Sequence, residues 1–247
     1  MRVESSAITR RLSNWRRLFL NSCTRAAQAV LPQHCLLCSA SASVRPLCGA
    51  CYIRLPWLTA PRCPQCALPT QAGNVCGACL SQPPRFDAVT AAFAYEWPLS
   101  TLIHHYKYAG NLALAGLLAN ALAACIATPV DLIIPMPLAP QRLRERGFNQ
   151  ALEVARIVSR ATGIALAVDA CRRVRDGAPQ AALPWQERAK NIRGAFVCDA
   201  DLSGRRVAVI DDVLTTGATL NELARNLRKA GAVEIHGWVV ARTLKQD

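Results

Sequence analysis

Eight of the twelve cysteines fall in four Cys-x-x-Cys pairs, a spacing typical of metal sites. Two residues between thiolates let one tight turn present both sulfurs to one ion, and two such turns complete a tetrahedron. The last two pairs repeat the first two at a constant offset of 28 residues. The predicted ligands are Cys35, Cys38, Cys48, Cys51, Cys63, Cys66, Cys76 and Cys79.

This pattern predicts two structural Zn2+ sites with four thiolates each. Pairing within each repeat is the simplest assignment, and spacing alone leaves crossed pairing open. Four cysteine ligands leave no open position on the metal, so catalytic zinc is not expected. Redox chemistry is the weaker alternative, because four pairs exceed what a dithiol active site needs.

A pair of carboxylates followed by a hydroxyl-rich turn is the other chemical feature of the chain. The apolar run 207–210 suits a buried strand, Asp211 and Asp212 follow it, and apolar residues recur at helical spacing from Leu220. The turn from Thr215 to Thr219 therefore places backbone N–H groups and hydroxyls at a helix N-terminus, where an anion binds well. Carboxylates beside an anion site suit a ligand with hydroxyls and a phosphate, such as a ribose 5-phosphate.

Two other interpretations of this stretch compete. A generic strand–turn–helix could carry two acids by chance, but both acids, the glycine and three threonines occur in register. A nucleoside triphosphate site of the Walker type is disfavoured, because the turn lacks the Gly-x-x-x-x-Gly-Lys spacing.

The run Val-Ile-Asp-Asp-Val-Leu-Thr-Thr-Gly-Ala-Thr at 209–219 resembles the 5-phosphoribosyl-1-pyrophosphate (PRPP) loop of type I phosphoribosyltransferases. It also resembles the ComF family (ComFC/GntX-like proteins), in which that domain follows a cysteine-rich zinc module. The resemblance implies an α/β fold, with a mostly parallel sheet and helices on both faces, preceded by a double zinc ribbon. It further implies that Asp211 and Asp212 contact the ribose 2′- and 3′-hydroxyls and that Mg2+ accompanies PRPP. The residues implied for the 5-phosphate are Thr215, Thr216, Gly217, Ala218 and Thr219.

Other segments extend the resemblance. Residues 136–138, after an expected strand at 131–135, resemble the pyrophosphate loop of the same superfamily, and 146–150 (Arg-Gly-Phe-Asn-Gln) match ComF-like chains. Lys107 opens a Lys-Tyr-x-Gly segment similar to one in ComF-like chains and is expected to face the site. The polar stretch 172–193 matches the position of the hood that closes over the substrate in phosphoribosyltransferases. The pyrophosphate-loop and basic candidates are Met136, Pro137, Leu138, Arg142, Arg144, Arg146 and Lys107.

The three arginines suit pyrophosphate because guanidinium groups pair with phosphate oxygens, with a solvated basic face as the alternative. One residue departs from the family pattern. Purine-salvage members commonly place a carboxylate, which handles the base proton, at the position of Thr215. A hypoxanthine–guanine activity is therefore not expected, and the sequence leaves open whether the site catalyses pentosyl transfer at all.

The chain of 247 residues carries a net charge of +13, with 29 Lys+Arg against 16 Asp+Glu. That surplus favours phosphate-bearing partners, whether a small molecule or single-stranded DNA. The ComF resemblance adds a second hypothesis, a non-catalytic nucleic-acid-binding accessory protein of DNA uptake that acts with other uptake proteins. A third, a PRPP-responsive regulator, needs a DNA-reading element that the sequence does not show.

The expected organisation is a basic amphipathic helix within 1–31, a double zinc ribbon at 32–82 and a phosphoribosyltransferase-like domain at 83–247. The helix is compatible with an anionic membrane surface or nucleic acid, although such helices more often pack on the domain that follows. No apolar run is long enough to span a bilayer and no secretory signal is visible, so a reducing cytoplasm is predicted.

Overall fold

The computed structural model describes residues 34–42, 46–175 and 192–244, and the chain forms two compact units, Met1–Arg54 and Leu55–Asp247. The predicted helix within 1–31 and most of the predicted hood lie outside the described residues. The domain boundaries expected at 31/32 and 82/83 stay a prediction.

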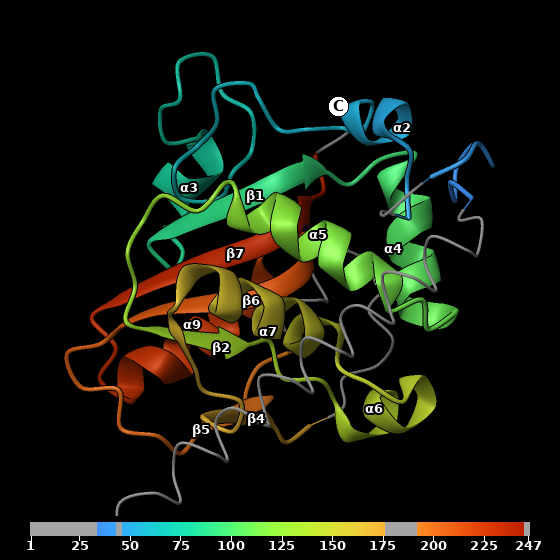
Figure 1. The fold of residues 1–247 in the computed structure, drawn as a ribbon. Coiled ribbons are helices and arrows are strands. Elements are labelled where there is room, and N and C mark those ends of the chain that lie inside the picture. Colours follow the sequence, from blue (N-terminus) through green and yellow to red (C-terminus); the bar gives the residue numbers. More distant parts are fainter. Residues whose placement is uncertain (1–33, 43–45, 176–191, 245–247) are drawn as a thin grey trace, which may run out of the picture. The chain divides into compact units, whose positions relative to one another are not determined.

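The larger unit is built on a five-stranded sheet in the order β1-β7-β6-β2-β3, and every neighbouring pair is parallel (Figure 1). A separate antiparallel pair, β4 and β5, flanks the predicted hood. The strands are β1 Ala88–Ala94, β2 Leu132–Pro135, β3 Ala165–Leu166, β4 Cys171–Arg173, β5 Phe196–Cys198, β6 Arg206–Leu214 and β7 Glu234–Arg242.

Helices cover both faces of this sheet, as predicted. The crossovers from β1 to β2 and from β2 to β3 run in one direction across the sheet, whereas the crossover from β6 to β7 runs in the other. Since such connections are right-handed, α5 and α7 share one face, where they contact each other, and α9 takes the opposite face. The helices are α2 Gly49–Ile53, α3 Gly77–Ser81, α4 Leu99–Tyr108, α5 Ala113–Ala123, α6 Pro140–Arg146, α7 Gln150–Thr162 and α9 Ala218–Lys229.

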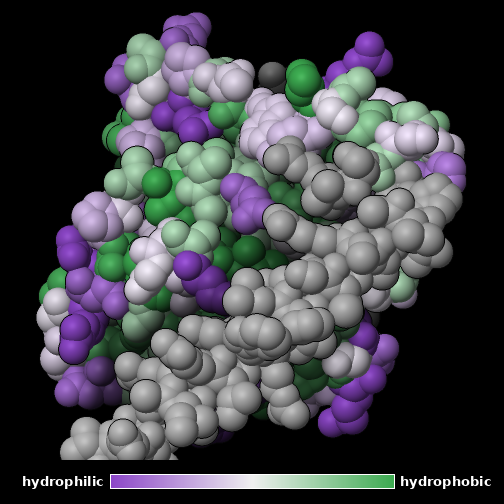
Figure 2. All heavy atoms as spheres, in the orientation of Figure 1, coloured by the Kyte–Doolittle hydropathy of each residue, from purple (hydrophilic) through white to green (hydrophobic). Residues whose placement is uncertain are grey.

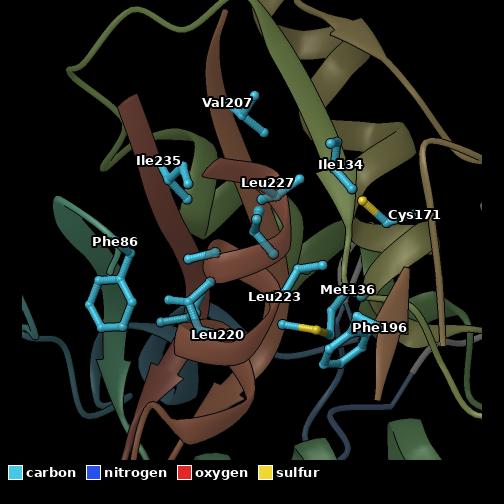
Figure 3. Close-up of a cluster of buried hydrophobic side chains, with 14 of the residues drawn as sticks. Phe86, Ile134, Met136, Cys171, Phe196, Val207, Leu220, Leu223, Leu227 and Ile235 are labelled. Atoms are coloured by element: carbon cyan, nitrogen blue, oxygen red, sulfur yellow. The ribbon is translucent and has the colours of Figure 1, made fainter. Parts of the chain in front are cut away.

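The core under α9 fixes this helix on the sheet. Leu220, Leu223 and Leu227 recur at helical spacing and pack with side chains from the strands, among them Val207 and Ile235 (Figure 3). Residues 207–210 are all buried, because β6 lies between two strands and is covered on both faces.

Strand β6 is longer than the sequence predicted. The acidic pair was expected after the end of the strand, but β6 continues to Leu214 and contains both acids. The cause is distant in sequence: β7 runs on to Arg242, and Asp211 lies opposite Val239 in the parallel register. No helix in the described part of the chain is long and apolar enough to cross a membrane.

Candidate functional site

A cavity of about 240 Å³ opens where β2 and β6 end. This is the edge at which parallel sheets of this kind bind ligands, because loops from neighbouring strands converge there. The cavity brings together Asp211, Asp212, Thr215, Gly217, Thr219, Met136, Pro137, Leu138, Arg142, Arg146 and Lys107 from the predicted set. Thr216, Ala218 and Arg144 are not among its lining residues.

Lys107 and Asp212, which both line the cavity, form an ion pair. Lys107, in the last turn of α4, places its Nζ 2.7 Å from Asp212 Oδ2. Burial lowers the pKa of Lys107, but the charge of Asp212, its hydrogen bond to the lysine and the charge of Asp211 together outweigh burial and raise this pKa above its ordinary value. Successive side chains of a strand point to opposite faces, which explains why Asp212 rather than its neighbour meets the lysine.

The pKa of Asp211 lies well above that of an ordinary aspartate. Burial and the charge of Asp212 raise its pKa to about 7, against the opposing effect of Lys107. Its Oδ1 also accepts a hydrogen bond from the Asp212 N–H at 2.8 Å. Near neutral pH the Asp211 carboxyl is therefore close to half-protonated. A bound cation or a hydroxyl donor would favour its charged form.

The turn after β6 has the conformation that a phosphate loop requires. Gly217 adopts φ 81°, a left-handed value that side chains other than glycine rarely tolerate, and is the N-terminal cap of α9. Thr216 Oγ1 accepts the Ala218 N–H at 3.1 Å. The first turn of α9 thus begins directly at the cavity, and its dipole favours an anion there.

Two further residues of the cavity, Asn149 and Gln150, were predicted only as members of the motif 146–150. Asn149 caps α7 and donates its Nδ2–H to the Met136 carbonyl at 3.1 Å, which ties the predicted pyrophosphate loop to the helix. Gln150 is 3% exposed, and its Nε2 has no hydrogen-bond partner within 34–42, 46–175 and 192–244. A buried amide donor on a cavity wall suits a ligand oxygen, since an unpaired buried donor is costly.

The arginines of α6 separate by helical geometry. Arg142 and Arg146 are four residues apart, share one helix face and line the cavity, whereas Arg144 is exposed. Arg146 lies over the Tyr108 ring, with its Cζ 5.1 Å from the centroid. The cavity is also lined by Arg173, from the predicted hood stretch 172–193, and by Tyr95, which was not predicted.

The eight predicted cysteines gather into two clusters, each from one repeat. In both, the four sulfur atoms lie within 4.8 Å of one another. The Sγ–Sγ distances are 3.7 Å for Cys38 and Cys48 and 3.6 Å for Cys66 and Cys76. A tetrahedral zinc ion with Zn–S bonds of ~2.3 Å requires an edge of ~3.8 Å, so both donor sets fit Zn2+.

The backbone of each turn also favours a thiolate. Burial raises the pKa of the Cys35 thiol, but N–H groups of Cys48 and Leu37 act against it, and the net effect lowers this pKa to about 6. The pKa of Cys63 is lowered to about 7 by the equivalent N–H groups of its own repeat, again against burial. Metal ligation by cysteine needs the deprotonated form.

The sheet, its ligand edge and the two thiolate clusters define an α/β protein of the phosphoribosyltransferase type that carries a double zinc ribbon. Residues 26–80 match the double zinc ribbon domain and residues 148–246 match the phosphoribosyl transferase domain. The DNA utilization protein YhgH of Escherichia coli (strain K12) is 35% identical over 191 residues, covering 74% of this chain and 84% of its own. The chain belongs to the ComF family.

Two further relatives support this assignment. Competence protein F of Haemophilus influenzae is 34% identical over 208 residues, covering 79% of this chain and 90% of its own. Competence protein ComFC of Streptococcus pneumoniae is 26% identical over 199 residues, covering 79% and 87%.

Proposed function

We propose that the larger unit binds a ribose 5-phosphate moiety, with PRPP as the full ligand, and serves a ComF-like role in DNA uptake or utilisation. One observation carries the binding proposal. A single cavity is lined by the acidic pair of β6, by the glycine turn at the start of α9 and by the 136–138 loop. The role in DNA rests on the relatives named for competence and for DNA utilization.

Each part of the ligand has a matching wall. Asp211 and Asp212 are the acceptors for the ribose hydroxyls, and the turn 215–219 receives the 5-phosphate. Arg142, Arg146 and Gln150 line the cavity, and they would receive the pyrophosphate. The carboxylates of Asp211 and Asp212 would hold a hard divalent cation such as Mg2+, which would supply positive charge beside the ligand.

The proposed function is ligand binding, and transfer of the pentosyl group would further require an acceptor molecule. In a transfer reaction these residues would hold the sugar and stabilise charge as pyrophosphate leaves, without a covalent nucleophile. Thr215 is exposed and cannot exchange a base proton as a carboxylate would. We therefore do not propose purine salvage. The thiolate clusters hold two structural Zn2+ ions and need a reducing compartment, which keeps a cytoplasmic location as our prediction.

Calorimetry with PRPP and with ribose 5-phosphate, in the presence of Mg2+, tests the binding proposal. The wild-type protein should bind both, and PRPP more tightly, because only PRPP reaches the arginine wall. The Asp131→Asn variant is a matched control: this carboxylate accepts from Arg206 at the opposite end of the same sheet, so ligand affinity should not change. Absence of any heat of binding in the wild-type protein would end this proposal.

Direct nucleic-acid binding is the second candidate. Arg144 is exposed on α6 beside the cavity, and the net charge of +13 favours polyanions. Figure 2 shows hydrophilic residues at several places on the face that it draws, outside the residues in grey. A salt titration with single-stranded DNA should show modest affinity that falls steeply with ionic strength, and Arg144→Ala should weaken it without affecting PRPP. Affinity that is unchanged between low and high salt would reject this candidate.

A further inference from the structure

The second cysteine cluster and the phosphate loop share one buried cation. Arg242, the last residue of β7, is 4% exposed, and its guanidinium has no carboxylate partner within the described residues. Its Nε–H donates to the Cys66 carbonyl at 2.7 Å. Its Nη1 donates to the carbonyls of Leu214 and Thr243, both at 2.9 Å, and to that of Thr215.

These contacts join two distant parts of the unit. Cys66 is a ligand of the second cluster, whereas Leu214 and Thr215 are the residues at which β6 passes into the phosphate loop. An arginine stays charged in proteins and donates from a rigid planar fork, so its acceptors are held in fixed relative positions. Four thiolates also outweigh a divalent ion, so a filled cluster is anionic and favours a cation beside it.

The two loop carbonyls decide where the loop amides face. In a trans peptide the carbonyl and the following N–H point in opposite directions. Holding the carbonyls of Leu214 and Thr215 toward Arg242 therefore turns the N–H groups of Thr215 and Thr216 away from it. An anion at the loop needs those donors presented on one side, before the ligand arrives.

The turn that carries Cys66 is itself attached to the sheet. The Val89 N–H at the start of β1 donates to the Pro64 carbonyl at 3.2 Å, and Ala67 is fully buried in the core under α9. Arg242 thus has a rigid support on its cluster side as long as the sulfur ligands are gathered.

We propose that Arg242 is a positioning residue that makes the phosphate loop depend on the metal in the second cysteine cluster. This rests on the proposed function for its ligand readout. Metal bound by Cys63, Cys66, Cys76 and Cys79 fixes the Cys66 carbonyl, which fixes Arg242 and hence the loop amides. Binding linkage is reciprocal, so a ligand in the loop must in turn retain the metal of the second cluster.

Two measurements on the full chain test this coupling. The first follows zinc release to a chromophoric chelator, with and without saturating ribose 5-phosphate. One of the two ions should leave more slowly with ligand, and Arg242→Lys should abolish that difference. Arg242→Lys and Arg242→Met should also weaken ribose 5-phosphate binding by about tenfold or more while both ions stay bound. Arg206→Lys, at the far end of β6, should change neither property.

The second measurement needs no ligand. Hydrogen exchange at the amides of residues 215–219 should speed up in Arg242→Lys and in protein stripped of metal. If ribose 5-phosphate does not bind the wild-type protein, the proposed function fails, and this exchange decides the coupling alone. An unchanged exchange rate at residues 215–219 would overturn the inference. A rate of zinc release that is the same with and without a ligand that binds would also overturn it.

Discussion

The two cysteine clusters have the same spacing but differ in how the rest of the protein uses them. The first belongs to the smaller unit, and its Cys38 is exposed. The second belongs to the unit of the sheet, where Cys66, the match of Cys38, is buried and its carbonyl accepts from Arg242. Ligand spacing determines the metal geometry and says nothing about what depends on the metal.

A single position in each repeat shows this difference. Ser39 and Ala67 each follow the second cysteine of a turn, lie 28 residues apart and have the same φ of 59°. Ser39 is exposed, whereas Ala67 is fully buried in the sheet core. The two turns thus share a backbone conformation, and at this position Ala67 packs in a hydrophobic core whereas Ser39 is exposed.

The largest expected effect comes from removing one ligand of each cluster in turn. Cys76→Ser should lower the free energy of unfolding of the larger unit by more than about 4 kcal/mol, the range reached when a structural metal is lost. It should also abolish ribose 5-phosphate binding. Cys48→Ser, its match in the first repeat, should unfold only the smaller unit and leave the ligand affinity unchanged. Metal analysis should find two zinc ions per chain in the wild-type protein and one in each variant; equal loss of ligand binding in both variants would break the comparison.

Replacing the acidic pair tests whether the cysteine clusters keep their zinc ions when ligand binding is lost. The double variant Asp211→Asn/Asp212→Asn should lose well over tenfold in PRPP affinity, since each charge-assisted hydrogen bond is worth roughly 1.5–3 kcal/mol. Stability should fall, because the loss of Asp212 leaves the partly buried Lys107 without its ion-pair partner, which outweighs the relief of repulsion between the two acids. Both zinc ions should remain, as measured by metal analysis. Lost stability with unchanged affinity would instead make the pair structural.

Exchanging the two turn residues sharpens the comparison at constant backbone conformation. Ala67→Ser buries a hydroxyl and should destabilise the larger unit by about 1–3 kcal/mol. Ser39→Ala removes an exposed hydroxyl and should be close to neutral. Chemical denaturation followed separately for each unit measures both, and equal effects would mean that the two turns are equally supported.

The last expected effect is a pH dependence confined to the larger unit. The folded-state pKa of Asp211 is raised to about 7 from 3.8, so the folded state holds this proton more tightly than the unfolded chain. The contribution is fully present below pH ~4 and is lost as pH rises toward 7. Asp211→Asn should therefore gain stability relative to wild type over that window. Denaturation at several pH values that shows a constant difference would contradict this.

Local patterns could be predicted from the sequence, and long-range pairings could not. Cysteine spacing is a property of one short turn, which is why both clusters and their pairing within repeats were confirmed. The prediction that the strand ends before Asp211 was wrong, because the length of β6 depends on its pairing with β7. Arg242 gave no signal, since Cys66 lies 176 residues away. From the sequence, Gln150 was only one member of the motif 146–150. Its amide is buried without a hydrogen-bond partner in the described residues, and that burial comes from other elements.

The segment before the second cluster has a consequence for aggregation. The Leu58 N–H donates to the Ala92 carbonyl at 3.0 Å, and the Ala94 N–H donates to the Pro56 carbonyl at 2.8 Å, so residues 56–58 shield the outer edge of β1. An uncovered edge strand offers its unpaired backbone groups to other chains. A fragment that begins at Leu55 keeps residues 56–58 along the edge of β1. A fragment that begins at Pro83 exposes this apolar edge and should self-associate through it.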